Sequence, residues 1–168
     1  MKDMPKIIVI AHNIRSTHNV GSIFRTCEGF GVEKITLSGY TPVPLAIGYD
    51  PVAGRLPHVA EKVTRQIQKA ALGAEDLVPF EHQETLDIAN LKAAGYRLVA
   101  LEQSDGSIDI SNYSTTENIA LLLGEEVNGI HPDLLSQCDD TVEIPMRGQK
   151  ESFNVSVAAG IALYALTT

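Results

Sequence analysis

Three short segments combine glycines with polar side chains, and they follow one another in the order of residues 19–26, 123–129 and 144–159. The first contains an arginine, whose guanidinium can bind a phosphate bidentately. The other two contribute carboxylates, hydroxyls and carboxamides that can position a ligand, and their glycines let the backbone approach it closely. Each segment alone is a weak signal, so the chemistry depends on which elements bring the three together.

Short β-branched runs alternate with helical patterns along the whole chain. The predicted strands cover residues 6–11, 34–37, 77–80, 97–101, 118–123 and 141–144, and the predicted helices cover residues 19–30, 59–72, 85–94 and 154–166. This alternation predicts an α/β fold with a parallel sheet of about six strands flanked by helices. Ligands of such folds bind beyond the carboxyl ends of the strands. All three segments follow predicted strands, so we expect one site at that edge.

The first segment predicts an amphipathic helix. Its apolar residues fall on one face of a 3.6-residue period, and Arg25 lies on the opposite side. Asn19 stands where a helix N-cap belongs, and capping alone would explain it. A solvated arginine is likewise the ordinary interpretation of Arg25 taken by itself.

The second and third segments each allow a plain structural interpretation. Gly124 and Gly129 suit a tight turn after a buried strand, and Ser152 and Asn154 suit the start of a helix. The last helix is apolar nearly all round, so we expect it to be buried on most sides. A small domain has difficulty covering such a terminal helix, which favours a homodimer through it.

The amino-acid composition is that of an ordinary globular protein, and the chain carries a net charge of −8. Residues 1–74 carry nine Lys or Arg against five Asp or Glu, whereas residues 75–143 carry two against fifteen. Lys62, Arg65 and Lys69 recur at helical spacing, which suits either a phosphate-binding stripe or a solvated face. No apolar run reaches the length of a membrane span. The two cysteines show no metal or redox spacing, so we expect a cytoplasmic protein with reduced thiols.

Together, and in this order, the three segments resemble the three motifs of the SpoU (TrmH-type) RNA 2′-O-methyltransferases of the SPOUT superfamily. The resemblance runs from about Ile7 to the C-terminus. It implies a SPOUT fold with a C-terminal deep trefoil knot and S-adenosyl-L-methionine as the cofactor. It also implies methyl transfer to a ribose 2′-hydroxyl of RNA, by a homodimer in which one subunit completes the other's site.

The resemblance also implies roles for individual residues. The catalytic set is Arg25, Asn19, Ser152, Asn154 and Glu126; the cofactor-binding set is Leu101, Gly124, Ile144, Met146, Ser152 and Phe153; no metal is implied. Phe153 stands where the family usually has Leu or Met, which is a small apolar change.

Arg25 is the principal catalytic residue by this resemblance, and it would serve the cofactor site of the partner subunit. An arginine is effectively always protonated, so it is a poor general base. It can instead bind a phosphate, position the ribose and stabilise a developing alkoxide. The phosphate or a water would then take the proton.

We expect residues 1–168 to form a single methyltransferase domain without a separate RNA-binding domain, which favours tRNA over ribosomal RNA as the substrate. The alternatives are the same reaction on ribosomal RNA, or a non-catalytic RNA-binding factor with the same fold. A receiver domain has the same strand–helix rhythm, but it needs acidic residues after the first strand. Residues 12–15 are not acidic.

Overall fold

The structure is a computed structural model that describes residues 4–168, and its centre is one parallel sheet. The sheet contains seven strands in the order β3-β2-β1-β6-β4-β7-β5, and every pairing is parallel. The strands are β1 (Ile7–His12), β2 (Lys34–Ser38), β3 (Phe80–Gln83), β4 (Tyr96–Leu101), β5 (Ile108–Asp109), β6 (Asn118–Leu123) and β7 (Asp140–Glu143). The predicted α/β class with a parallel sheet is therefore confirmed.

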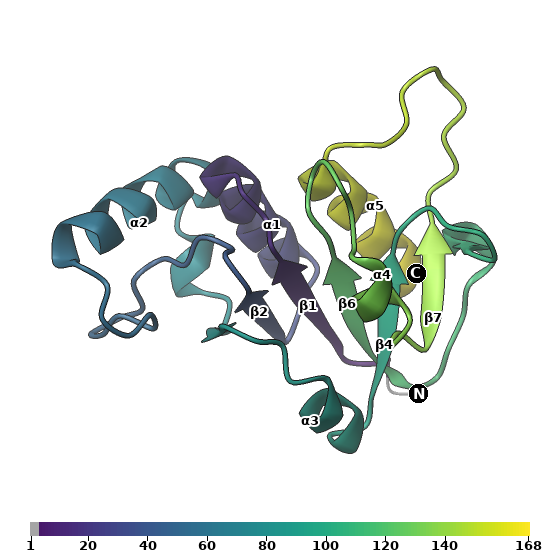
Figure 1. Cartoon of the computed structure of the whole chain (residues 1–168), viewed down its shortest axis with the longest axis horizontal. Coiled ribbons are helices and arrows are strands. Elements are labelled where there is room, and N and C mark those ends of the chain that lie inside the picture. Colours follow the sequence, from purple (N-terminus) through teal and green to yellow (C-terminus); the bar gives the residue numbers. More distant parts are fainter. Residues whose placement is uncertain (1–3) are drawn as a thin grey trace.

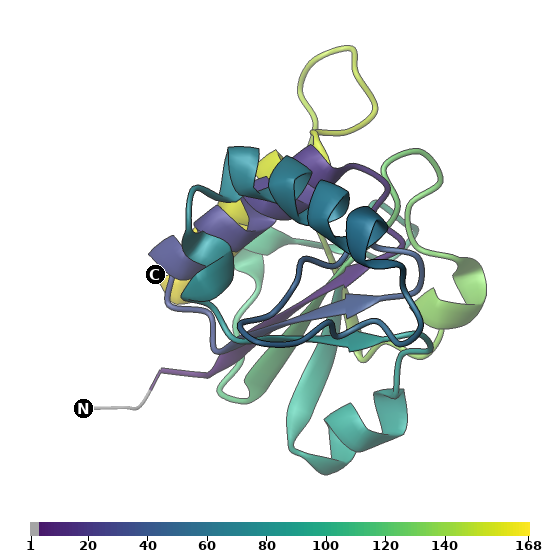
Figure 2. The ribbon, with the colours of Figure 1, turned by 90° about the vertical axis from the view of Figure 1, so that its left-hand side faces the viewer.

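Helices cover both faces of this sheet, as Figures 1 and 2 show. Helices α1 (Thr17–Gly29), α2 (Pro57–Ala71) and α5 (Val155–Thr167) lie over one face. The short helices α3 (Ile88–Ala93) and α4 (Pro132–Leu135) lie over the other. An apolar core fills each side, because the strands are buried on both faces and alternate residues point into opposite layers.

Helix α1 occupies the middle of the three-helix layer. Its predicted apolar face is buried, with Val20, Phe24 and Cys27 fully enclosed. The prediction that Asn19 caps this helix is wrong. Ser16 is the N-cap, and its hydroxyl accepts a hydrogen bond of 3.1 Å from the backbone N–H of Asn19. The side chain of Asn19 is thereby free for a contact across the fold.

Some other observed elements also differ from those expected. The third strand is Phe80–Gln83 rather than residues 77–80, and it follows a turn of 3₁₀ helix at residues 74–76. The two-residue strand β5 and the four-residue helix α4 were not expected, since such short elements leave no periodic pattern. The trefoil knot implied by the family stays a prediction.

Helix α5 is less buried within one chain than its sequence predicts. Only Ala159, Ala162 and Leu163 are fully buried, whereas an apolar stripe of Val157, Ile161 and Tyr164 is exposed. Thr26 of α1 lies next to Gly160, so α5 packs on α1 through small residues.

The segment between β7 and α5 stands clear of the body beyond the carboxyl edge of the sheet (Figures 1 and 2). In the described part of the chain, no helix combines the length and apolar character that a membrane span requires.

Candidate functional site

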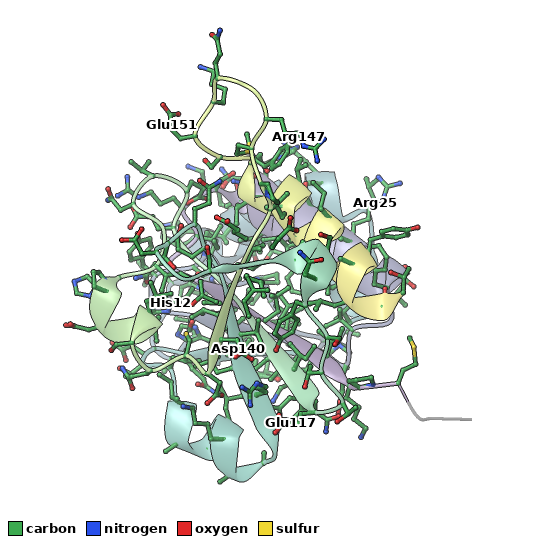
Figure 3. All side chains as sticks on the ribbon, turned by 90° about the vertical axis from the view of Figure 1, so that its right-hand side faces the viewer. His12, Arg25, Glu117, Asp140, Arg147 and Glu151 are labelled. Carbon is green, nitrogen blue, oxygen red and sulfur yellow. The ribbon has the colours of Figure 1, made fainter. Side chains whose placement is uncertain are left out.

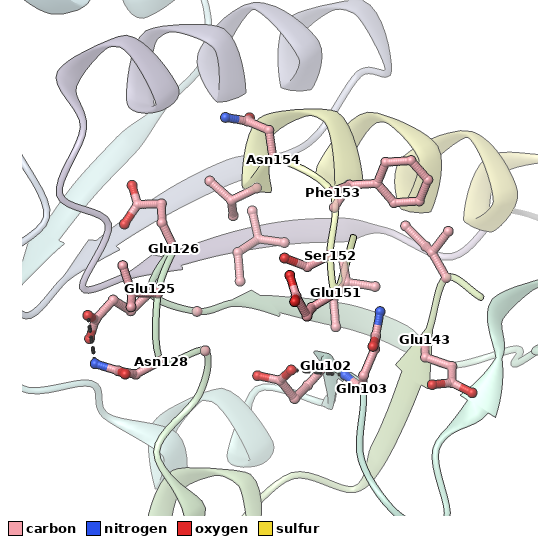
Figure 4. A pocket seen from close by; sticks show the side chains of 18 residues that line it. Glu102, Gln103, Glu125, Glu126, Asn128, Glu143, Glu151, Ser152, Phe153 and Asn154 are labelled. Atoms are coloured by element: carbon pink, nitrogen blue, oxygen red, sulfur yellow. Dashed lines mark hydrogen bonds between the residues drawn. The ribbon is translucent and has the colours of Figure 1, made fainter. Parts of the chain in front are cut away.

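The three motif segments meet at the carboxyl edge of the central strands, where the second and third line a cavity of about 580 Å³ (Figure 4). Its walls come from the ends of β4, β6 and β7, from the turn after β6, and from the segment that enters α5. This arrangement follows from the parallel sheet, because the ends of β4, β6 and β7 lie side by side at one edge. The three segments therefore lie together at the predicted edge, and their role as the functional site stays a prediction.

Most of the predicted cofactor-binding residues line this cavity. They are Leu101, Gly124, Ile144, Ser152 and Phe153. Met146 is not among the lining residues. It lies in the segment that leaves the body after β7, two residues beyond the lining residue Ile144.

Glu126 ties the turn after β6 to the start of α1. Its carboxylate accepts hydrogen bonds from the backbone N–H of Arg15 at 3.1 Å and from that of Ser16 at 3.2 Å. The side-chain amide of Asn19 donates a third, at 3.1 Å. Burial alone would raise the pKa of Glu126, but these donors outweigh it and the pKa lies below its usual value.

Asn19 carries the connection on to the third segment. Its amide oxygen accepts a hydrogen bond of 3.1 Å from the side chain of Asn154. Asn154 in turn caps α5, because its own amide oxygen accepts from the backbone N–H and the hydroxyl of Ser156. One chain of hydrogen bonds, from Glu126 through Asn19 to Asn154, thus joins all three segments.

Two glycines shape the turn after β6 for a steric reason. A Cβ on Gly124 would lie 2.7 Å from the carbonyl carbon of Gly129 and 2.8 Å from the backbone nitrogen of Ile130. Gly129 has a φ of +66°, and a Cβ there would collide with the carboxylate of Glu102. That carboxylate accepts a hydrogen bond of 2.9 Å from the backbone N–H of Ile130, which fixes the turn against the end of β4.

The lining is strongly acidic. Five glutamates contribute to it, and none of its described residues is Lys, Arg or His. These glutamates are Glu102, Glu125, Glu126, Glu143 and Glu151, several of which face the cavity in Figure 4. Sequence reasoning identified only Glu126. Glu102 and Glu143 stand at the ends of strands, so the rule that ligands bind at this edge could have found them.

Two of the predicted catalytic residues, Asn19 and Arg25, do not line the cavity. Asn19 is hydrogen-bonded to the lining residues Glu126 and Asn154, whereas Arg25 lies apart from them. It is exposed on α1, and Figure 3 shows it projecting on the side of the molecule where α5 lies. It does not line the cavity of its own chain. Within residues 4–168, no three His, Cys, Asp or Glu side chains gather as metal ligands would.

The family model described as "SpoU rRNA Methylase family" matches residues 45–164. The chain belongs to this family. The resemblance drawn from the three motifs is therefore confirmed, and the cavity lies where the second and third SpoU motifs meet.

The relatives of this SpoU chain are named for different RNA substrates. It is 30% identical over 163 residues to a tRNA (guanosine(18)-2'-O)-methyltransferase of Aquifex aeolicus, covering 97% of this chain and 69% of that protein. It is also 30% identical over 165 residues to the 23S rRNA (guanosine-2'-O-)-methyltransferase RlmB of Coxiella burnetii. That match covers 97% of this chain but only 58% of the Coxiella protein, so the chain spans little more than half of this relative.

A solved structure supports the same fold. The AdoMet-bound rRNA methyltransferase of Sinorhizobium meliloti superposes with a TM-score of 0.81 over 98% of this chain and 57% of that one. The sequence identity is 24%, so this likeness concerns the fold.

Proposed function

We propose that the protein is an S-adenosyl-L-methionine-dependent RNA methyltransferase that methylates a ribose 2′-hydroxyl, with tRNA favoured over ribosomal RNA. The observation that carries this proposal is the hydrogen-bond chain from Glu126 through Asn19 to Asn154. It joins three segments far apart in the sequence, two of which line the cavity. Membership of the SpoU family supports the same reaction.

The cavity suits this cofactor in size and chemistry. Its volume of about 580 Å³ lies in the range of small-molecule sites, roughly 300–1,000 Å³. Apolar side chains such as Leu101, Ile144 and Phe153 can contact an adenine, and Gly124 lets the ligand approach the backbone. The acidic lining favours a ligand with positive charge, and both the sulfonium and the amino group of the cofactor carry one.

The bound cofactor would supply an activated methyl group, so the chain's own residues have to assist the weak nucleophile, the ribose 2′-hydroxyl. A 2′-hydroxyl loses its proton during attack, and negative charge develops on its oxygen. The Arg25 guanidinium can bind a neighbouring phosphate and stabilise that oxygen. Asn19, Glu126 and Asn154 hold the segments in place, and Ser152 lies in the wall where the ribose would approach.

We further propose that the enzyme is a homodimer and that Arg25 acts in the partner's site. Arg25 does not line the cavity of its own chain, so one chain alone leaves the catalytic set incomplete. The exposed stripe of Val157, Ile161 and Tyr164 on α5 offers an apolar surface for a second copy. Helix α1 packs directly beside α5, so pairing through α5 would bring each Arg25 toward the other subunit.

Ribosomal RNA is the second candidate substrate, because the Coxiella relative that is as similar as the Aquifex one is named for 23S rRNA. We place the enzyme in the cytoplasm, where Cys27 and Cys138 would stay reduced. Both thiols are free, and burial raises the pKa of each, for Cys138 to about 11.

The deciding test is methyl transfer from labelled S-adenosylmethionine to unmodified tRNA, compared between the wild-type chain and Arg25→Ala. We expect turnover to fall on the order of 10²–10³-fold, the effect of losing one oriented stabilising donor. Lys34→Ala removes a cation that is paired with Glu81 on the sheet and should leave turnover unchanged.

Near-normal turnover of Arg25→Ala would contradict the catalytic role. Transfer to ribosomal RNA but not to tRNA would select the second candidate. Binding of RNA without any binding of S-adenosylmethionine would favour the non-catalytic factor.

A further inference from the structure

The basic side chains of the described residues divide into two groups. One group forms ion pairs within 4.0 Å, namely Lys6, Arg15, Lys34, Arg55, Lys92 and Arg97. The other group forms no ion pair within 4.0 Å among residues 4–168, namely Arg25, Lys62, Arg65, Lys69, Arg147 and Lys150. Of these, Arg147 still lies near enough to Asp109 to help lower the pKa of that carboxyl. The division follows position in the fold.

The unpaired group is confined to two places. Arg25 lies on α1 and three of the cations lie on α2, two helices that pack side by side over one face of the sheet (Figure 2). Arg147 and Lys150 lie in the segment that stands beyond the carboxyl edge. In Figure 3, Arg147 and Arg25 project on the same side of the molecule, whereas Glu151 projects on the other.

The cations of α2 form one stripe. Lys62, Arg65 and Lys69 are three and four residues apart, so they share a face of the helix, and all three are exposed. The buried residues of α2, which include Thr64 and Ile67, lie on the opposite face. The stripe therefore points straight into solvent and spans about 10 Å along the helix axis at 1.5 Å per residue.

Unpaired cations are unexpected in a chain with 21 acidic and 13 basic residues. Carboxylates are abundant enough to pair with them, as they do with the basic residues near the sheet. Glu61 is the only acidic residue of α2, and in the described structure it forms no ion pair with the three cations of the stripe. The cavity, by contrast, is lined by five glutamates and would repel a polyanion.

We propose that RNA binds along the stripe of Lys62, Arg65 and Lys69, and that its backbone continues past Arg25 toward the basic residues of the segment before α5. Each of the three side chains of the stripe can neutralise one phosphate of the bound strand. This inference rests on the proposed function for its ligand class. It adds that the subunit supplying Arg25 also holds the RNA, while the acidic cavity across the dimer holds the methyl donor.

The test compares two triple variants that remove the same charge. Lys62→Gln, Arg65→Gln and Lys69→Gln together neutralise the stripe and retain good helix formers. Lys6→Gln, Lys34→Gln and Lys92→Gln neutralise three paired cations elsewhere. The Kd for an unmodified tRNA transcript is measured from 50 to 300 mM salt, alongside the Kd for S-adenosylmethionine and the Tm.

The stripe variant should bind tRNA at least tenfold more weakly at low salt, and its slope of log Kd against log salt should fall by about two to three. The control triple should stay within twofold of wild type, and both should retain cofactor affinity and Tm. Equal losses in the two variants, or a stripe variant within twofold of wild type, would overturn the proposal. So would stripe-dependent binding to vesicles containing phosphatidylserine that tRNA fails to displace.

The outcomes also separate this inference from the proposed function. If the wild-type chain binds tRNA through the stripe but transfers no methyl group, the RNA-binding surface is supported and the proposed methyltransferase function is wrong. If the wild type and the stripe variant transfer methyl groups equally well, the methyltransferase function is supported and the proposed RNA-binding surface is wrong.

Discussion

The carboxylate of Glu126 accepts hydrogen bonds from donors that lie 107 to 111 residues earlier in the chain. A hydrogen bond to a charged acceptor is stronger than one between neutral groups and contributes about 1.5–3 kcal/mol to stability. Glu126 is therefore more than a side chain in the cavity wall. Its charge fixes the start of α1, and through Asn19 it also fixes the start of α5.

This charge predicts a specific dependence of stability on pH. The folded-state pKa of Glu126 lies below its value in the unfolded chain, near 4.5. Its contribution is therefore fully present above pH of about 5 and is lost as pH falls through the folded pKa. Glu126→Gln should lower the free energy of unfolding by about 1–2 kcal/mol at pH 7 and by less at pH 3.

The measurement is urea unfolding of both proteins between pH 3 and 7. Glu151→Gln is the matched control, because Glu151 lies on the same cavity but is exposed and should change stability by less than about 0.5 kcal/mol. If the difference between wild type and Glu126→Gln stayed constant across that pH range, the assigned role of the charge would be wrong.

At the scale of elements, local patterns predicted the strands and helices that have a clear period. The strand at residues 118–123 was predicted with its observed bounds, because it is a continuous apolar run between polar residues. The expected helix over residues 85–94 is shorter, Ile88–Ala93, since Asp87 caps it. Strand β5 is held by its pairing in the sheet, and helix α4 begins at a proline. Neither element is long enough to leave a sequence pattern.

The site was predicted less completely than the fold, for a physical reason. The motifs identified the three segments, but the hydrogen bonds that join them are all long-range, so no local pattern distinguishes Asn19 as a cap from Asn19 as a tertiary partner. The acidic lining was missed because Glu102 and Glu143 belong to no motif. Only the sheet order, with β4 between β6 and β7, brings them to the cavity.

The packing of α1 on α2 gives a prediction at this scale. A Cβ on Gly21 would lie 2.9 Å from both the Cβ of Ala70 and the backbone nitrogen of Ala71, and it would strike the carbonyl oxygen of Ile67. Because backbone atoms cannot yield cheaply, Gly21→Ala should cost about 1–3 kcal/mol. Gly29→Ala in the same helix meets nothing within 4 Å and should be neutral or stabilising by up to about 1 kcal/mol.

Thermal unfolding of the two alanine variants tests this contrast, since both add one methyl group to α1. Gly21→Ala should also weaken tRNA binding, because it moves the α2 stripe relative to Arg25. A Gly21→Ala variant as stable as Gly29→Ala would mean that the two helices pack less closely than the structure has them.

For the whole molecule, the proposed homodimer places Arg25 of one chain at the cavity of the other, because Arg25 does not line the cavity of its own chain. This proposal predicts complementation between two inactive variants. Arg25→Ala keeps an intact cavity, and Ile144→Trp fills the cavity but keeps Arg25. In a mixed dimer, one of the two sites combines the intact cavity of the first chain with the arginine of the second, as the symmetry of a two-fold dimer dictates.

Unfolding and refolding an equimolar mixture should therefore restore about a quarter of the wild-type turnover, since half of the dimers are mixed and each has one complete site. Adding Ile161→Lys to both chains places a charge in the exposed α5 stripe. It should abolish the recovery and halve the mass in solution, while each chain stays folded because Ile161 is exposed on its own chain. No recovery from a mixture that does form mixed dimers would mean that Arg25 acts within its own subunit. The segment before α5 would then have to move to bring Arg25 and the cavity together.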